Sequence, residues 1–197
     1  MTDPAHMRAA HAPRRGWAVA LIGALALAGC GEEPVEWPED PPPPTSTLTP
    51  AEAAAVDEIL SLLDAYRAAA VAIHADPPAP ADAKQQLTDY LADPLLTVTL
   101  LELDLMRSRG LVRAGAPASE ATVVELRMDE QPPAANIREC LDATGWPVTD
   151  RSGTEVDGAT GLPAWATADR HVLTLTARKL DGQWLLSDAH VERGEQC

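Results

Sequence analysis

The apolar residues of this chain change their spacing at Gly110, and this change limits the possible folds more than any other feature. Before Gly110 they recur every three or four residues, the spacing of one helix face, as at Val56, Ile59 and Leu63. After it they alternate as in strands, and TVVELRMD places on one side Val124, Leu126 and Met128. Helices followed by a meander of antiparallel strands predict an α+β domain.

The helical part opens with a capping box, in which Thr49 and Glu52 each accept a hydrogen bond from the other's backbone amide. Pro50 suits the first turn of such a helix. Tyr66, further along, is interpreted as a core residue. The spacing predicts three helices, over residues 50–75, 81–91 and 95–109.

The clearest strand pair is RHVLTLTARKLDGQWLLSDAHVERG, near the end of the chain. Asp181-Gly182 is the dipeptide that best fits a two-residue type I′ turn, so it predicts a hairpin. In that register the facing pairs are Lys179–Trp184, Ala177–Leu186, Leu175–Asp188, Leu173–His190 and His171–Glu192. These side chains share one face, which is apolar near the turn and polar at its far end.

Four polar side chains are therefore expected to converge: His171, Asp188, His190 and Glu192. In one hypothesis His190 is a general base or acid oriented by Asp188 or Glu192, because imidazole titrates near neutral pH and a carboxylate fixes its tautomer. A zinc site of His171, His190 and Glu192 is an alternative. In a third interpretation they are solvated residues of a hairpin that extends past the core. A slip of one residue would separate them. No metal or cofactor is predicted.

The chain begins with a leader that is first basic and then apolar. The apolar run Trp17–Ala28 is too short to cross a bilayer as a helix of about 20 residues, and it follows Arg8, Arg14 and Arg15. Residues 1–29 are therefore interpreted as a secretory signal. The motif Leu27-Ala28-Gly29-Cys30 looks like a bacterial lipobox, which implies cleavage before Cys30 and acylation of its sulfur. An ordinary cleaved signal is the alternative.

Residues 30–49 join this cysteine to a predicted domain over 50–197. They hold six prolines and five acidic residues, and they bury too little apolar surface to fold, so they are expected to form an extended tether. Without residues 1–29, which carry three of the 15 basic and one of the 30 acidic residues, the formal charge is −17. Such a surface repels phosphate, which excludes nucleic acid and leaves membrane binding to two or three acyl chains.

Two cysteines remain beside Cys30, and an even pair outside the cytoplasm predicts a disulfide between Cys140 and Cys197. On the chain-entropy model this bridge would stabilise the fold by about 4 kcal/mol. Two free thiols are the alternative. In ANIRECLDA, Cys140 is expected to point away from Ile137 and Leu141.

The second half of the chain holds three motifs: Cys140 with Asp142, Asp181-Gly182 with Trp184, and Cys197. In this the chain resembles the secreted and lipid-anchored actinobacterial proteins with a nuclear transport factor 2-like domain, also called SnoaL-like or ketosteroid isomerase-like. The resemblance covers about residue 52 to the end. It implies a cone fold, in which helices cover the concave face of a curved sheet, and it implies that open sheets can pair into homodimers.

The expected protein is an actinobacterial lipoprotein anchored at the extracytoplasmic face of the cell membrane. Its expected role is non-catalytic, the binding of an envelope protein or a small apolar ligand. The alternative is a small enzyme of isomerase or dehydratase type that uses an apolar cone pocket with His190 and Asp188. An exposed hairpin end and a filled cone would favour binding, whereas an enclosed His190 beside an empty cavity would favour the enzyme.

Overall fold

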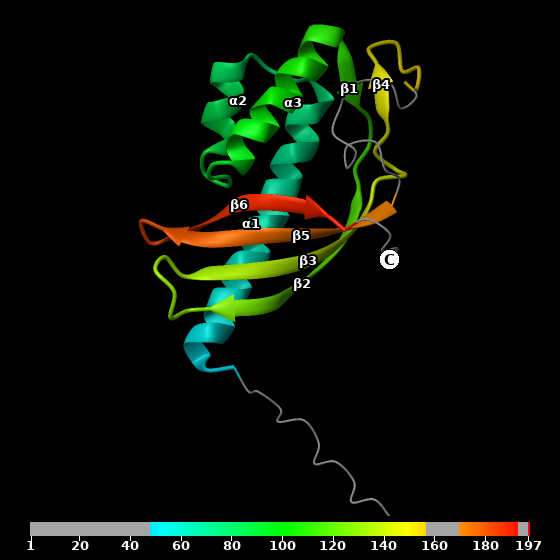
Figure 1. The fold of residues 1–197 in the computed structure, drawn as a ribbon. Helices are drawn as coiled ribbons and strands as arrows, with labels where there is room; N and C mark the ends of the chain where they lie inside the picture. The colour runs from blue at the N-terminus through cyan, green and yellow to red at the C-terminus, as the bar shows by residue number, and fades with distance from the viewer. Residues whose placement is uncertain (1–47, 157–169, 193–196) are drawn as a thin grey trace, which may run out of the picture. The chain divides into compact units, whose positions relative to one another are not determined.

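A computed structural model of the chain describes residues 48–156, 170–192 and 197 (Figure 1). The predicted signal over 1–29 and nearly all of the predicted tether, Cys30 included, lie outside the described residues. Within the described residues, no helix is both long enough and apolar enough to cross a membrane.

The described residues form three helices: α1 (Pro50–Ala75), α2 (Pro80–Leu87) and α3 (Leu95–Arg109). The predicted capping box is confirmed, because Thr49 N donates to Glu52 Oε2 at 2.7 Å and Glu52 N donates to Thr49 Oγ1 at 3.3 Å. Gly110 ends α3 in the left-handed region at φ 68°, which favours glycine.

The second helix is shorter than predicted, and the prediction that it reaches Leu91 is wrong. The backbone after Leu87 pairs with the strand β6 (Gln183–Val191) instead of continuing the helix. Leu186 N donates to the carbonyl of Tyr90 at 2.9 Å, and Ala92 N donates to the carbonyl of Leu186 at 2.8 Å.

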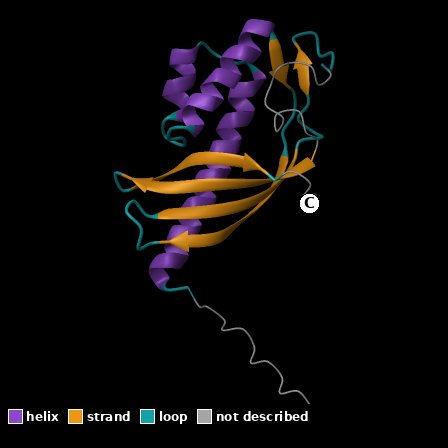
Figure 2. Ribbon diagram, viewed as in Figure 1, coloured by secondary structure: helices purple, strands orange, loops and turns teal. Residues whose placement is uncertain are grey.

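Antiparallel strands make up the second layer, and the predicted α+β class is confirmed. The four-stranded sheet has the order β2-β3-β5-β6, formed by β2 (Ala118–Arg127), β3 (Ala134–Asp142), β5 (Arg170–Leu180) and β6. A smaller pair joins β1 (Leu111–Arg113) to β4 (Val148–Asp150). Helix α1 crosses one face of the curved sheet (Figure 2). We call the space between this face and the helices the cone.

The core fills the cone from both layers. Side chains of α1 meet alternate residues of the central strands, because every second residue of a strand points to the same face. The residues that are at most 2% exposed include Ile59, Leu63, Leu103, Ile137, Leu175 and Leu186.

A bulge in β2 changes the predicted faces of this strand. In β2, Val124 has no partner in β3, because Val123 pairs with Ile137 and Glu125 pairs with Asn136. The extra residue turns Val124 outward, where it is 57% exposed, while Leu126 packs against the core. The expectation that Val124 and Leu126 share a face is therefore wrong. A bulge shifts the residues beyond it by one position, which the alternation alone does not reveal.

The predicted disulfide between Cys140 and Cys197 is confirmed, with the two Cα atoms 5.8 Å apart. Cys140 lies in β3 and points away from the core, opposite to the buried Ile137 and Leu141, as predicted. The Sγ atom of Cys197 lies 3.6 Å from the carbonyl oxygen of His171. A disulfide sulfur carries no hydrogen, so this is a contact and not a hydrogen bond. The bridge joins residue 197 to the end of the central strand β3.

Candidate functional site

The hairpin β5–β6 follows the predicted register only near its turn. Asp181 and Gly182 have φ values of 50° and 85°, and Lys179 pairs with Trp184 as predicted. Ala177 also pairs with Leu186. Beyond this point Ser187 is an extra residue in β6, so that Thr176 pairs with Asp188 and Thr174 pairs with His190. The predicted partners of Asp188 and His190, which were Leu175 and Leu173, are therefore wrong.

The bulge separates the four polar residues that were expected to converge. His171 is 4% exposed on the core-facing side of β5, beside Leu141. Asp188 and His190 point outward and are exposed, and Glu192 Oε1 accepts a hydrogen bond from Thr174 Oγ1 at 2.7 Å. The predicted cluster is wrong because of this shift. The roles of His190 and Asp188 in catalysis stay a prediction. Neither side chain is enclosed, which was the condition that would favour the enzyme.

The zinc alternative also depended on this convergence. Among the described residues, no group of three or more His, Cys, Asp and Glu side chains is arranged to hold a metal ion. The segment that begins at Asp150, the last residue of β4, forms a local turn. Asp150 Oδ1 accepts hydrogen bonds from the backbone amides of Ser152 and Thr154, at 2.8 and 3.0 Å. The hydrogen bond from the Ser152 hydroxyl, together with these two amide bonds, holds the pKa of Asp150 below its usual range.

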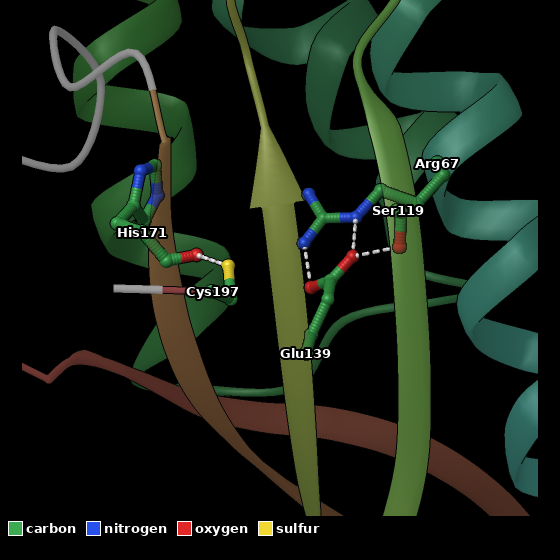
Figure 3. A network of polar contacts seen from close by, with 5 residues as sticks. All are labelled: Arg67, Ser119, Glu139, His171 and Cys197. Atoms are coloured by element: carbon green, nitrogen blue, oxygen red, sulfur yellow. Dashed lines mark hydrogen bonds and ion pairs between the residues drawn. The ribbon is translucent and has the colours of Figure 1, made fainter. Parts of the chain in front are cut away.

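Polar residues that the sequence analysis missed lie inside the cone. Glu139 of β3 is fully buried, and Arg67 of α1 binds both of its oxygens (Figure 3). Arg67 Nε donates to Glu139 Oε1 at 2.8 Å, and Nη2 donates to Oε2. Ser119 of β2 donates to the same carboxylate at 2.5 Å. The result is a two-pronged ion pair, which connects the helix to two strands of the sheet.

A second buried cluster surrounds Trp146, which is 4% exposed. The guanidinium of Arg113 lies 4.5 Å from the centre of the indole, and its Nη1 donates to the Trp146 carbonyl at 2.9 Å. The His74 ring meets the same indole edge-on at 5.1 Å. Glu102 Oε1 lies 3.7 Å from His74 Nε2 and 4.0 Å from Arg113 Nη2. Burial lowers the pKa of Arg113, and the Glu102 carboxylate opposes this shift.

Several atoms of this second cluster lack a hydrogen bond. His74 Nδ1 lies 2.7 Å from the carbonyl of Ala70, and because a carbonyl only accepts, Nδ1 must carry the hydrogen. In the part of the chain that the structure describes, His74 Nε2, both Glu102 oxygens and the Trp146 indole nitrogen are buried without a hydrogen-bond partner. Such groups are commonly satisfied by buried water.

Tyr66 lies near both clusters and is 7% exposed, which agrees with its predicted place in the core. Burial raises the pKa of its phenol. Nearby Arg67 lowers this pKa, whereas the Glu102 and Glu139 carboxylates raise it further. The phenol therefore stays protonated at neutral pH and can donate a hydrogen bond within the cone.

The cavity left among these residues is small. Its volume is about 30 Å³, and its lining includes Tyr66, Arg67, His74, Arg113 and Trp146. This is enough space for about one or two water molecules. Pockets that bind small organic ligands have volumes of roughly 300–1,000 Å³. Side chains thus fill the cone, and neither His190 nor Asp188 lines its cavity.

A larger hollow of about 790 Å³ lies on the surface, between α1 and the turn of the β5–β6 hairpin. It is widely open, and Asp57, Glu58 and Ser61 line one side of it. On the other side Lys179 forms an ion pair with Glu58, at 3.3 Å, and lies 5.7 Å from the centre of the Trp184 ring. Glu58 and Lys179 are thus paired across this hollow, and the pair contributes to the contact between helix and hairpin.

Comparisons with known proteins add little to this geometry. No protein-family model matches the chain, and no curated protein matches it. Among solved structures, the chain is similar to the intermembrane space region of the chloroplast protein ARC6. The TM-score is 0.45 and the sequence identity 9%, over 69% of this chain and 95% of that one. A likeness at this level says nothing about the activity of this chain.

Proposed function

We propose that this chain is a lipoprotein of the cell envelope, which acts by binding another envelope component through its surface. In this proposal acyl chains on Cys30 hold the domain at the extracytoplasmic face of the membrane. The domain belongs, in the same proposal, to the nuclear transport factor 2-like group that its motifs resemble. The observation that carries the binding role is the filled cone.

The cavity volume favours a binding role over an enzyme. An isomerase or dehydratase of the kind considered above needs an enclosed pocket for its substrate, yet the cone leaves about 30 Å³. Its two best catalytic candidates, His190 and Asp188, are exposed on the outward face of β6. The same volume argues against a small apolar ligand in the cone, so we favour a protein partner that contacts the surface.

The disulfide supports the location. Such bonds persist in oxidising compartments and are rare in the cytoplasm of most organisms. The Cys140–Cys197 bridge leaves Cys30 as the one cysteine of the sequence outside the pair. A free cysteine directly after a basic and apolar leader is where a lipoprotein is acylated. The formal charge of −17 beyond the leader means that attachment depends on acyl chains, because the protein surface is repelled by anionic headgroups.

Metabolic labelling with a clickable palmitate analogue tests the anchor. The full-length wild type should carry the label and sediment with membranes, whereas Cys30→Ala should lose both properties. Cys197→Ala is the matched control: it breaks the disulfide but keeps the proposed acylation site, so it should still be labelled. Equal labelling of wild type and Cys30→Ala, or none in either, would contradict the anchor.

A hydrophobic dye distinguishes surface binding from a ligand pocket. In the folded full-length chain, Ala70→Leu should leave the binding of anilinonaphthalene sulfonate unchanged, because a cavity of about 30 Å³ cannot hold the dye and any dye that binds lies on the surface. The matched variant Trp146→Ala opens the cone and should bind it. Saturable binding to the wild type, lost when Ala70→Leu narrows the cavity, would favour the enzyme or small-ligand alternative.

A further inference from the structure

Helix α3 carries an apolar stripe on its outer side that the core does not use. Pro94, Val98, Leu101 and Leu105 follow each other at steps of four, three and four residues, so they lie along one line of the helix surface. We call these four residues the α3 stripe. The opposite side of α3 is buried and contributes Leu96, Leu103 and Met106 to the interior.

The α3 stripe is exposed to an unusual degree. Leu101 is 66% exposed, the highest value among the large exposed hydrophobic residues that the structure describes, and Val98 is 42% exposed. Leu105 is partly buried and Pro94 is exposed. In Figure 1, α3 lies in front of the upper part of α1 and beside α2. A single exposed leucine needs no explanation, but a row of neighbouring apolar residues along one side of a helix is typical of a helix that packs against a partner.

The stripe is complementary to a second copy of itself. Leu101 lies at its middle, with Val98 and Leu105 at nearly equal distances on either side. Two copies that cross antiparallel therefore place Leu101 against Leu101, and Val98 against Leu105. The two ends of the helix also carry opposite charges: Asp93 precedes it, whereas Arg109 and Arg107, which is paired with Asp104 of the same helix at 2.8 Å, are in its last turn. An antiparallel pair brings each acidic end beside a basic end and aligns the helix dipoles favourably.

We propose that the α3 stripe is the interface of a symmetric homodimer, in which two α3 helices pack antiparallel about a two-fold axis near Leu101. A two-fold interface must be self-complementary, and the stripe meets this requirement in the spacing of its residues and in the charges at the two ends of its helix. The inference depends only on the described domain, and it holds with or without the lipid anchor.

Other surfaces fit this partner less well. The outward face of the sheet, through which open sheets could pair, is polar and carries Arg138, Thr174, Thr176 and His190. A groove of about 320 Å³ between α1 and the edge strand β2 is lined by apolar residues, Leu48 and Val124 among them, but the polar Thr122 and Glu125 line it too. A helix of 15 residues is about 22 Å long, so the pair buries less than the roughly 800 Å² per partner of a standard interface. The dimer is therefore expected to be weak and to depend on concentration.

Cysteine cross-linking locates the interface. Leu101→Cys, in the purified full-length chain in mild detergent, should form an interchain disulfide on mild oxidation, because the two positions face each other across the axis. Val124→Cys is the matched control, since it is similarly exposed but lies on the sheet edge. Cross-linking of Leu101→Cys clearly above Val124→Cys and above the wild type supports the proposal. Equal or stronger cross-linking at Val124 overturns it.

Sedimentation equilibrium measures the strength of the interaction. The wild type should show a monomer–dimer equilibrium, and Leu101→Glu should raise its Kd at least about tenfold, because both copies lose a leucine and gain a facing carboxylate. Val124→Glu should leave the Kd within about twofold. Unchanged far-ultraviolet circular dichroism excludes unfolding as the cause. A wild type that stays monomeric at every concentration, or equal effects of the two variants, overturns the proposal.

Discussion

The buried pair of Arg67 and Glu139 makes a quantitative prediction about stability. Removal of one partner from a buried ion pair costs about 3–5 kcal/mol, because the other charge remains without compensation. The two partners differ in exposure: the Glu139 side chain is 0% exposed, whereas that of Arg67 is 16% exposed. Arg67→Met should therefore cost about 4–5 kcal/mol, and Glu139→Leu about 3 kcal/mol, since Arg67 still reaches some water.

The double variant gives the sharper test. When Arg67→Met and Glu139→Leu are combined, no charge is left uncompensated and apolar surface replaces the pair, so the stability should return to within about 1 kcal/mol of the wild type. Arg151→Met is the matched control, because Arg151 and Asp76 are paired at 3.1 Å but are 60% and 79% exposed. This control should cost less than about 0.5 kcal/mol.

Urea unfolding of the full chain with its disulfide intact, followed by tryptophan fluorescence, measures these differences. With a slope of about 2 kcal/mol per molar urea, a loss of 4 kcal/mol moves the midpoint by about 2 M. If both single variants lose less than about 1 kcal/mol, or if the double variant loses the sum of the two, the pair is not desolvated and coupled as described.

Three further predictions concern other parts of the fold. Replacement of both Cys140 and Cys197 by Ser should lower the free energy of unfolding by about 4 kcal/mol, and a reductant should then have no further effect on the melting temperature. Burial raises the pKa of Tyr66 above the ordinary value of 10.0, so the contribution of this phenol to stability should be intact below about pH 10 and be lost as the pH rises further; Tyr66→Phe should flatten this decline in urea midpoints measured against pH. Ile137→Ala should cost about 2–5 kcal/mol in the same assay, since this side chain is 0% exposed and its loss leaves a cavity. A variant that matches the wild type in its assay would refute the corresponding argument.

Local signals in the sequence predicted the elements well. The capping box at Thr49 gave the start of α1, Gly110 gave the end of α3, and Asp181-Gly182 gave the turn of the hairpin. Each of these depends on backbone chemistry within a few residues, so it is visible without the rest of the fold. The disulfide was predictable for a similar reason, because few cysteines were available to pair.

The candidate site was harder to predict, because it depends on how distant segments meet. The bulge at Ser187 has no sequence signal of its own, and it moved His190 and Asp188 to the outward face. Glu139 had a signal that was overlooked: it alternates with Ile137 and Leu141, so the same rule places all three on the core-facing side. Its partner Arg67, 72 positions earlier in the sequence, had none.

The central claim is that acyl chains on Cys30 attach this domain to the membrane. Mass spectrometry of the N-terminal peptide of the protein, isolated from cells that produce it, tests this most directly. The account predicts a mature chain that begins at Cys30 and carries a diacylglyceryl group on its sulfur. An unmodified Cys30, or a leader that is still attached, would contradict the account.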